Sequence, residues 1–278
     1  MEKTICELFA GVGGFRLGFE KASDAWKTVW FSQWEPGKKN QWAHDCYVSH
    51  WGDINEFTGI DIAQVDKLTI PAHNLLVGGF PCQDYSVARP LSGSSGIEGK
   101  KGVLWWQIRD TLIAKKAPFV LLENVDRLLK SPANQRGRDF GIILACLDSL
   151  GYYVEWRVIN AADYGAAQKR RRTFIFATSK TTKFYLEHHT LTPDRIIGCE
   201  GFFAKSFPVA GQGKTSTIEI NSSDIVDVSE SFKFEFQNAG TMVNGKISTA
   251  KITPVYETPT TLRSILEQNV PEKYYLGK

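Results

Sequence analysis

The chain has 278 residues, of which 42% are hydrophobic and 23% are charged, and its formal net charge is +3. This composition is typical of a soluble globular protein with a sizeable core, and so small a charge does not by itself indicate nucleic acid as a partner. No apolar run reaches the roughly 18 residues of a membrane span, and no signal-peptide pattern opens the chain. The five cysteines lack disulfide or Cys-x-x-Cys spacing. We therefore expect a cytoplasmic protein with no membrane contact and no metal.

The first 180 residues alternate strand-like and helix-like segments. The expected strands cover residues 4–9, 29–34, 75–77, 119–122, 152–159 and 173–177, and the expected helices cover residues 15–22, 41–49, 104–115 and 140–150. This alternation predicts an α/β domain over residues 1–180, Rossmann-like, with a mostly parallel sheet and helices on both faces. In such sheets ligands bind beyond the carboxyl ends of the strands, so the polar residues that follow each strand are the candidate site.

The character of the chain changes after residue 180. Residues 181–278 are rich in Thr, Ser, Gly and Pro and contain short β-type runs such as residues 232–236. We expect no clear helix there before residues 260–267. We interpret this second part as a β-leaning region that is incomplete as a domain.

Cys82 is the most informative residue of the chain. It stands in Gly-Gly-Phe-Pro-Cys-Gln-Asp-Tyr-Ser (residues 78–86), just beyond an expected buried strand and before a polar, glycine-rich segment. A cysteine thiolate is a strong nucleophile, and this placement suits attack on a bound ligand. A buried structural cysteine is the commoner role of a lone Cys, and this stretch alone leaves both interpretations open.

A glycine-rich turn follows the first expected strand. Residues 9–15 read Phe-Ala-Gly-Val-Gly-Gly-Phe and lead directly into an expected helix. Such a turn lets the backbone approach a ligand at a helix N-terminus, although it departs from the dinucleotide pattern Gly-x-Gly-x-x-Gly. A simple connecting turn is the alternative.

Two carboxylates are placed to complete a nucleoside site. Glu35 follows the second expected strand, where an acidic side chain accepts hydrogen bonds from ribose hydroxyls. Asp53, which we expect beyond a further strand, is placed to reach an adenine amino group. Each residue is also a candidate helix cap or surface carboxylate, but their joint occurrence favours an adenosine-bearing ligand.

Four motifs together resemble the DNA (cytosine-5) methyltransferases. They are Phe-Ala-Gly-Val-Gly-Gly (9–14), Gly-Phe-Pro-Cys-Gln (79–83), Glu-Asn-Val (123–125) and Gln-Lys-Arg-Arg-Arg (168–172), in the order of that family. The match covers roughly residues 3–178, and the set is highly specific although no single motif would suffice.

The resemblance implies a covalent mechanism. Cys82 adds to carbon 6 of cytosine, carbon 5 takes the methyl group, and loss of the carbon-5 proton expels the cysteine. Glu123 holds or protonates ring nitrogen 3, which a raised pKa would favour. Arg170 and Arg172 lie near the cytosine carbonyl oxygen and the neighbouring phosphate, and Arg171 on a strand should point to the opposite face.

The resemblance also implies a cofactor and a DNA site. The cofactor is S-adenosylmethionine, with S-adenosylhomocysteine as product, and the expected cofactor-binding residues are Phe9, Gly11, Gly13, Gly14, Glu35, Asp53, Ile54, Pro81 and Leu104. The partner is duplex DNA, from which the target base must be flipped out. The expected DNA-binding residues are Gln83, Ser86, Lys100, Lys101 and Gln168, with the lysines on phosphate.

The chain departs from the family pattern in two places. Pro36 stands where many members have an aromatic residue against the adenine. The two motifs that follow the target-recognition region in the family are also not found in residues 181–278. We interpret the chain as one subunit of a split restriction-modification enzyme, whose second polypeptide supplies the missing motifs. A tRNA cytosine-5 methyltransferase and a non-catalytic DNA-binding fragment are the alternatives.

Overall fold

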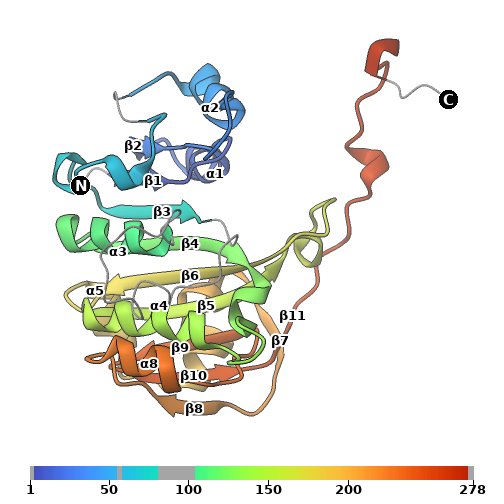
Figure 1. The fold of residues 1–278 in the computed structure, drawn as a ribbon. Helices are drawn as coiled ribbons and strands as arrows, with labels where there is room; N and C mark the ends of the chain where they lie inside the picture. Colours follow the sequence, from blue (N-terminus) through green and yellow to red (C-terminus); the bar gives the residue numbers. More distant parts are fainter. Residues whose placement is uncertain (1–2, 55–57, 81–103, 275–278) are drawn as a thin grey trace.

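The computed structural model describes residues 3–54, 58–80 and 104–274. Among these residues, nine strands form one sheet in the order β2-β1-β3-β4-β6-β5-β9-β10-β8 (Figure 1). Their bounds are β1 Lys3–Leu8, β2 Trp26–Ser32, β3 Leu75–Gly79, β4 Phe119–Val125, β5 Tyr152–Asn160, β6 Arg171–Ser179, β8 Ser216–Glu219, β9 Ala239–Val243 and β10 Lys246–Ala250. A separate pair joins β7 (Val209–Gln212) to β11 (Ile252–Pro254).

The sheet is parallel in its first part and antiparallel beyond it. Strands β2, β1, β3 and β4 pair in parallel, whereas β6 runs antiparallel to both β4 and β5. The remaining strands continue the antiparallel pairing through β9. Strands from both expected regions of the chain thus share one sheet, and the boundary at residue 180 stays a prediction.

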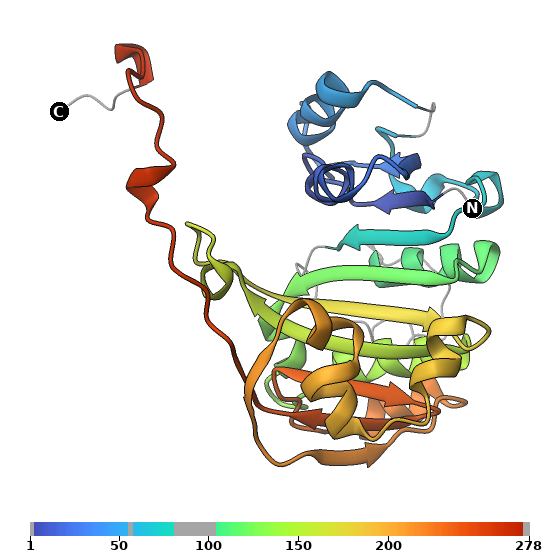
Figure 2. The same ribbon diagram turned by 180° about the vertical axis from the view of Figure 1, so that it is seen from behind.

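Helices cover both faces of the sheet. Alternate residues of β1 face opposite ways, since Cys6 and Leu8 belong to the core under α3 and α4 whereas Ile5 packs toward α1. Helices α3 (Leu104–Lys115), α4 (Arg138–Ser149) and α8 (Ile225–Ser231) lie on the face seen in Figure 1. Figure 2 shows the other face, with α1 (Gly14–Ala22), α5 (Lys183–His188) and α7 (Phe202–Ser206). The expected Rossmann-like α/β fold is confirmed.

The second part of the chain contains more helix than expected. Helices α5, α6 (Pro193–Arg195), α7 and α8 all precede residue 260, so the expectation of no helix there is wrong. They are short, three to seven residues each, and too brief to show a periodic apolar pattern. The helix expected at 260–267 is only a 3-10 turn at Leu262–Ser264, in a segment that extends away from the body (Figures 1 and 2).

No helix within the described ranges combines the length and the apolar character that crossing a bilayer requires.

A buried carboxylate lies behind the turn that follows β1. Glu7 is 0% exposed, and its Oε2 accepts a hydrogen bond of 3.0 Å from the hydroxyl of Tyr47 on α2 (Trp42–Trp51). Its Oε1 is buried without a hydrogen-bond partner. Burial raises the pKa of Glu7 to about 7, although the Tyr47 hydrogen bond and the Arg16 charge act in the opposite direction.

We predict that Glu7→Gln stabilises the protein at pH 8 and not at pH 5. The folded state of the wild type holds a proton on Glu7 up to about pH 7, whereas the unfolded chain releases it near pH 4.5. The protonated Glu7 therefore contributes its full stabilisation below pH 4.5, and this stabilisation is lost as the pH rises to about 7. The free energy of unfolding falls by about 3 kcal/mol at most over this range. Urea unfolding of both proteins at the two pH values measures this.

Glu20→Gln is the matched control. Glu20 belongs to the same cluster, since it accepts hydrogen bonds from Arg16 and from the Trp51 indole, but its side chain is 42% exposed. We expect this variant to keep most of the wild-type loss of stability between pH 5 and pH 8, because burial is the largest cause of the raised Glu7 pKa and the Glu20 charge is the smallest. An unchanged difference between pH 5 and pH 8 in Glu7→Gln would show that Glu7 does not titrate as inferred.

Candidate active site

Glu123 and two arginines converge at the carboxyl end of β4. Glu123 Oε1 lies 2.9 Å from Nε of Arg172 and 3.2 Å from Nη2 of Arg170. The antiparallel register pairs Val125 of β4 with Arg172 of β6, so the start of β6 lies beside the end of β4. Glu123 and Arg172 are largely buried, with side-chain exposures of 19% and 26%. The structure thus brings together the three expected catalytic residues that lie in its described part.

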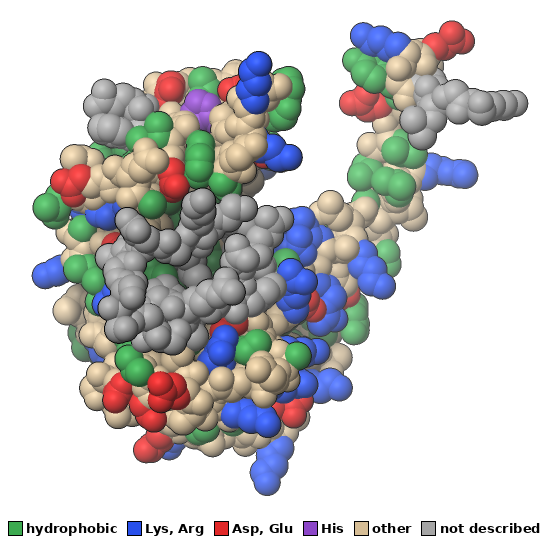
Figure 3. All heavy atoms as spheres, viewed as in Figure 1, with side chains coloured by type: hydrophobic (Ala, Val, Ile, Leu, Met, Phe, Trp, Pro, Cys, Tyr) green, Lys and Arg blue, Asp and Glu red, His purple; other side chains and the backbone are tan. Residues whose placement is uncertain are grey.

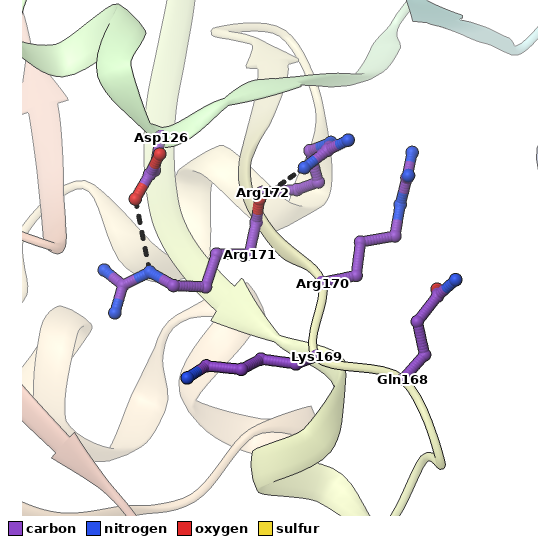
Figure 4. Close-up of a pocket in the computed structure, with 6 residues that line it drawn as sticks. All are labelled: Asp126, Gln168, Lys169, Arg170, Arg171 and Arg172. Atoms are coloured by element: carbon purple, nitrogen blue, oxygen red, sulfur yellow. Dashed lines mark hydrogen bonds and ion pairs between the residues drawn. The ribbon is translucent and has the colours of Figure 1, made fainter. Parts of the chain in front are cut away.

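Arg171 points away from this cluster. Its Nε forms an ion pair of 3.2 Å with Asp126 Oδ2, just beyond β4. Because successive side chains of a strand alternate between its faces, Arg171 and Arg172 cannot share one partner. The predicted opposite orientation of Arg171 is confirmed, and Figure 4 shows the Arg171 and Arg172 side chains diverging.

A basic pocket of about 440 Å³ opens at this edge of the sheet. Residues 168–172 and Asp126 line it, and Gln168 and Lys169 bring their side chains to it from the loop before β6 (Figure 4). Figure 3 shows Lys and Arg side chains gathered on this side of the molecule. Guanidinium and ammonium groups together suit a phosphate-bearing ligand.

The strand that leads to the expected nucleophile ends beside Glu123. Gly79 of β3 pairs with Glu123 in the parallel register, and Asn124 Nδ2 donates a hydrogen bond of 3.1 Å to the carbonyl oxygen of Phe80. A Cβ on Gly79 would lie 3.5 Å from Glu123 Oε2, so little space separates the two strands' ends. The expected site residues Pro81, Cys82, Gln83, Ser86, Lys100 and Lys101 lie outside the described residues.

The glycine turn beyond β1 has a left-handed backbone. Phe9, Gly11 and Gly13 have φ values of 56°, 58° and 88°, which explains the glycines at two of these positions. A Cβ on Gly13 would collide with the Trp51 ring, whereas Cβ atoms on Gly11 and Gly14 would meet nothing within 4 Å. The turn is therefore closed toward α2 and open at the N-terminus of α1, which leaves a ligand access to the backbone.

The two expected carboxylates lie just beyond β2 and α2. Glu35 lies just beyond β2, and its Oε2 accepts a hydrogen bond of 3.4 Å from the Ala43 amide in the first turn of α2. Asp53 follows α2 and not a strand, so that part of the expectation is wrong. It is exposed, and its Oδ1 accepts a hydrogen bond of 2.6 Å from Thr58.

The other expected cofactor residues lie on the same part of the fold. Ile54 is 38% exposed, next to Asp53, and Leu104 begins α3 and packs against the main core. An open glycine turn, two accessible acceptors and an exposed apolar side chain fit a ligand that has both a polar sugar and an apolar base.

The sequence did not reveal the residues that support this site. Gln33 is buried, and its Oε1 accepts a hydrogen bond of 2.7 Å from the Gly11 amide. Thr58 is 1% exposed and holds Asp53. Neither residue stands in a motif, and the only available signal for Gln33 is its position next to the end of a strand.

Comparison with known proteins assigns the chain to a family. The model of the C-5 cytosine-specific DNA methylase family matches residues 3–274. Type II methyltransferase M.Sau3AI of Staphylococcus aureus is 48% identical over 280 residues, which are 99% of this chain and 68% of that protein. Type II methyltransferase M.NgoBI of Neisseria gonorrhoeae is 39% identical over 185 residues, 66% of this chain and 53% of that protein.

Solved structures support the fold. The Entamoeba histolytica methyltransferase EhMeth has a TM-score of 0.50 and 20% identity, covering 66% of this chain and 54% of that one. A DNA modification methyltransferase encoded within an E. coli prophage has a TM-score of 0.50 and 17% identity, covering 79% and 60%. With the family match over nearly its whole length, the chain belongs to the C-5 cytosine-specific DNA methylases and is an enzyme of the methyltransferase class.

Proposed function

We propose that this chain methylates carbon 5 of cytosine in a specific duplex DNA sequence, with Cys82 as the nucleophile and S-adenosylmethionine as the methyl donor. The observation that carries the proposal is the cluster of Glu123, Arg172 and Arg170. Glu123 Oε1 lies 2.9 Å from Arg172 Nε and 3.2 Å from Arg170 Nη2. The cluster lies beside the strand that leads to Cys82. The family membership of the chain supports it.

The chemistry explains why these residue types are needed. Carbon 5 of cytosine is a poor nucleophile until the Cys82 thiolate forms a bond to carbon 6. This addition places negative charge on the ring, which Glu123 stabilises through a proton shared with ring nitrogen 3. Carbon 5 then takes the methyl group that bound S-adenosylmethionine supplies. Removal of the carbon-5 proton restores the double bond and breaks the bond between sulfur and carbon 6.

The arginines have two tasks in this scheme. A guanidinium that already contacts Glu123 holds its carboxyl group in one orientation, and its remaining donors are free for a carbonyl or phosphate oxygen. Arg172 is the more buried of the two arginines, so we assign it to Glu123 and the base. Arg170, with a side chain 50% exposed, is assigned to the phosphate of the flipped nucleotide.

Glu123→Gln tests the acid. We predict a fall in kcat of roughly 10² to 10⁴, the range for loss of a positioned general acid, with DNA affinity nearly unchanged because the amide keeps the size of the side chain. Single-turnover methylation and a DNA-binding titration measure the two quantities. Asp126→Asn is the matched control, because it also removes a carboxylate paired with an arginine. An equal loss in both variants would contradict the assignment.

Cys82→Ser tests the nucleophile and the substrate class together. We expect the wild type to form a stable adduct with duplex DNA that carries 5-fluorocytosine, because fluorine blocks the last elimination step. The serine variant should form none. A gel shift under denaturing conditions detects the adduct. Methyl transfer to tRNA in place of duplex DNA would support the tRNA enzyme. DNA binding without an adduct, both by the chain alone and with the missing family motifs supplied on a separate polypeptide, would support a non-catalytic fragment.

A second polypeptide is the finer part of the proposal. The chain spans 68% of the length of M.Sau3AI and 53% of that of M.NgoBI, and the closing family motifs were not found in residues 181–278. We propose that these motifs are needed for full activity and that, supplied on a separate polypeptide, they complete the recognition region and the cofactor pocket.

Complementation tests this inference. We predict that the part of M.Sau3AI without a counterpart in this chain, added as a separate polypeptide, raises DNA methylation at least tenfold. Labelled methyl transfer to mixed-sequence duplex DNA is the measurement, with Cys82→Ser as the control. Full activity of this chain alone would overturn the inference about a second polypeptide and leave the catalytic assignment intact.

A further inference from the structure

Thr58 connects two parts of the expected cofactor site. Its hydroxyl lies 2.6 Å from Asp53 Oδ1 and 2.9 Å from His44 Nε2. Its carbonyl oxygen accepts a hydrogen bond of 2.8 Å from the backbone N–H of Gln33. The side-chain Oε1 of Gln33 in turn accepts a hydrogen bond from the backbone N–H of Gly11. One buried threonine thus connects the Asp53 carboxylate with the glycine turn.

The hydrogen bonds at Thr58 have a defined direction. A hydroxyl has one proton to donate, and the Asp53 carboxylate can only accept it. Thr58 must therefore accept from His44, which requires that His44 carries a proton on Nε2.

The His44 ring is itself held in place. It stacks on Phe31 with the ring centroids 6.1 Å apart, and a Cβ on Gly59 would lie only 3.2 Å from His44 Nε2. The His44 side of this hydrogen-bond chain is therefore packed on both sides, and Thr58 connects it to the exposed Asp53 carboxylate.

We propose that Thr58 is a positioning residue that orients Asp53 to accept a hydrogen bond from the exocyclic amino group of the cofactor's purine. This inference rests on the proposed function. A freely rotating carboxylate could also turn away from a purine that presents a carbonyl oxygen at position 6. A carboxylate held through Oδ1 cannot, so it rejects hypoxanthine and selects adenine.

The test compares two ligands that differ in the group at position 6 and in the proton on the neighbouring ring nitrogen 1. S-adenosylhomocysteine and its analogue with hypoxanthine in place of adenine are titrated calorimetrically into the full chain, both alone and with the missing family motifs supplied on a separate polypeptide. We expect Thr58→Val to weaken S-adenosylhomocysteine binding roughly 5- to 30-fold and to reduce the preference for adenine by a similar factor. Thr58→Ser, which keeps the hydroxyl, should stay within about twofold of the wild type on both counts.

Two further variants separate positioning from stability. Thr241→Val removes another buried hydroxyl, which donates to the Val154 carbonyl in the distant β9–β5 pair, and should leave the adenine preference unchanged. Thr58→Ala removes the hydroxyl and the methyl group without placing a new methyl group beside the Asp53 carboxylate. It replaces Thr58→Val in the titrations if Thr58→Val does not fold.

Asp53→Asn distinguishes the two levels of the proposal. If the wild type shows no preference for adenine, the adenine contact of Asp53 in the proposed function is wrong, and the inference about Thr58 is overturned with it. If Asp53→Asn loses the preference while Thr58→Val and Thr58→Ala keep it, the contact stands and the positioning role of Thr58 is overturned. Loss of the preference in all three variants supports the proposal.

Discussion

The antiparallel pairing of β4 with β6 is the constraint on which the candidate site depends. Because the two strands run in opposite directions, the end of β4 lies beside the start of β6. Residues 47 positions apart in the chain, Glu123 and Arg170, therefore meet in one ion pair. A parallel β6 would bring its far end to Glu123 and leave the carboxylate without a guanidinium. The alternation of side chains along β6 then places Arg172 toward Glu123 and Arg171 toward Asp126.

The parallel strands supply the other half of the arrangement. The carboxyl ends of β1, β3 and β4 lie at one edge of the sheet, so the glycine turn, the approach to Cys82 and Glu123 follow from a single topological fact. The expected cofactor side and the expected base side are therefore neighbours, as direct transfer of a methyl group requires. Behind the turn, Glu7 remains buried with one unsatisfied oxygen, which carries a cost in free energy.

Buried polar groups attach the second part of the chain to the sheet. Glu155 of β5 accepts hydrogen bonds from the Tyr153 hydroxyl and the Phe202 amide, at 2.8 Å and 3.0 Å. Arg157, 2% exposed, donates to the carbonyl oxygens of Phe207 and Ile197. Separation of these elements would break the hydrogen bond from the Phe202 amide to Glu155 and both hydrogen bonds that Arg157 donates, which is unfavourable. These contacts fix residues 196–207 relative to the catalytic sheet.

Much of the fold and the core of the site followed from the sequence alone. Hydrophobic runs and their spacing revealed the strands and long helices of the first 180 residues, because burial requires apolar residues at fixed periods. The four motifs together, among them those around Glu123 and residues 168–172, were sufficient to predict the family, since the chemistry of cytosine methylation restricts the residue types. The tertiary structure decided which groups meet. Thr58 carries no motif, and its role arises only because the fold places its hydroxyl between His44 and Asp53. The short helices α5 to α8 were likewise invisible in the sequence, because their stability comes from packing against the sheet and not from local periodicity.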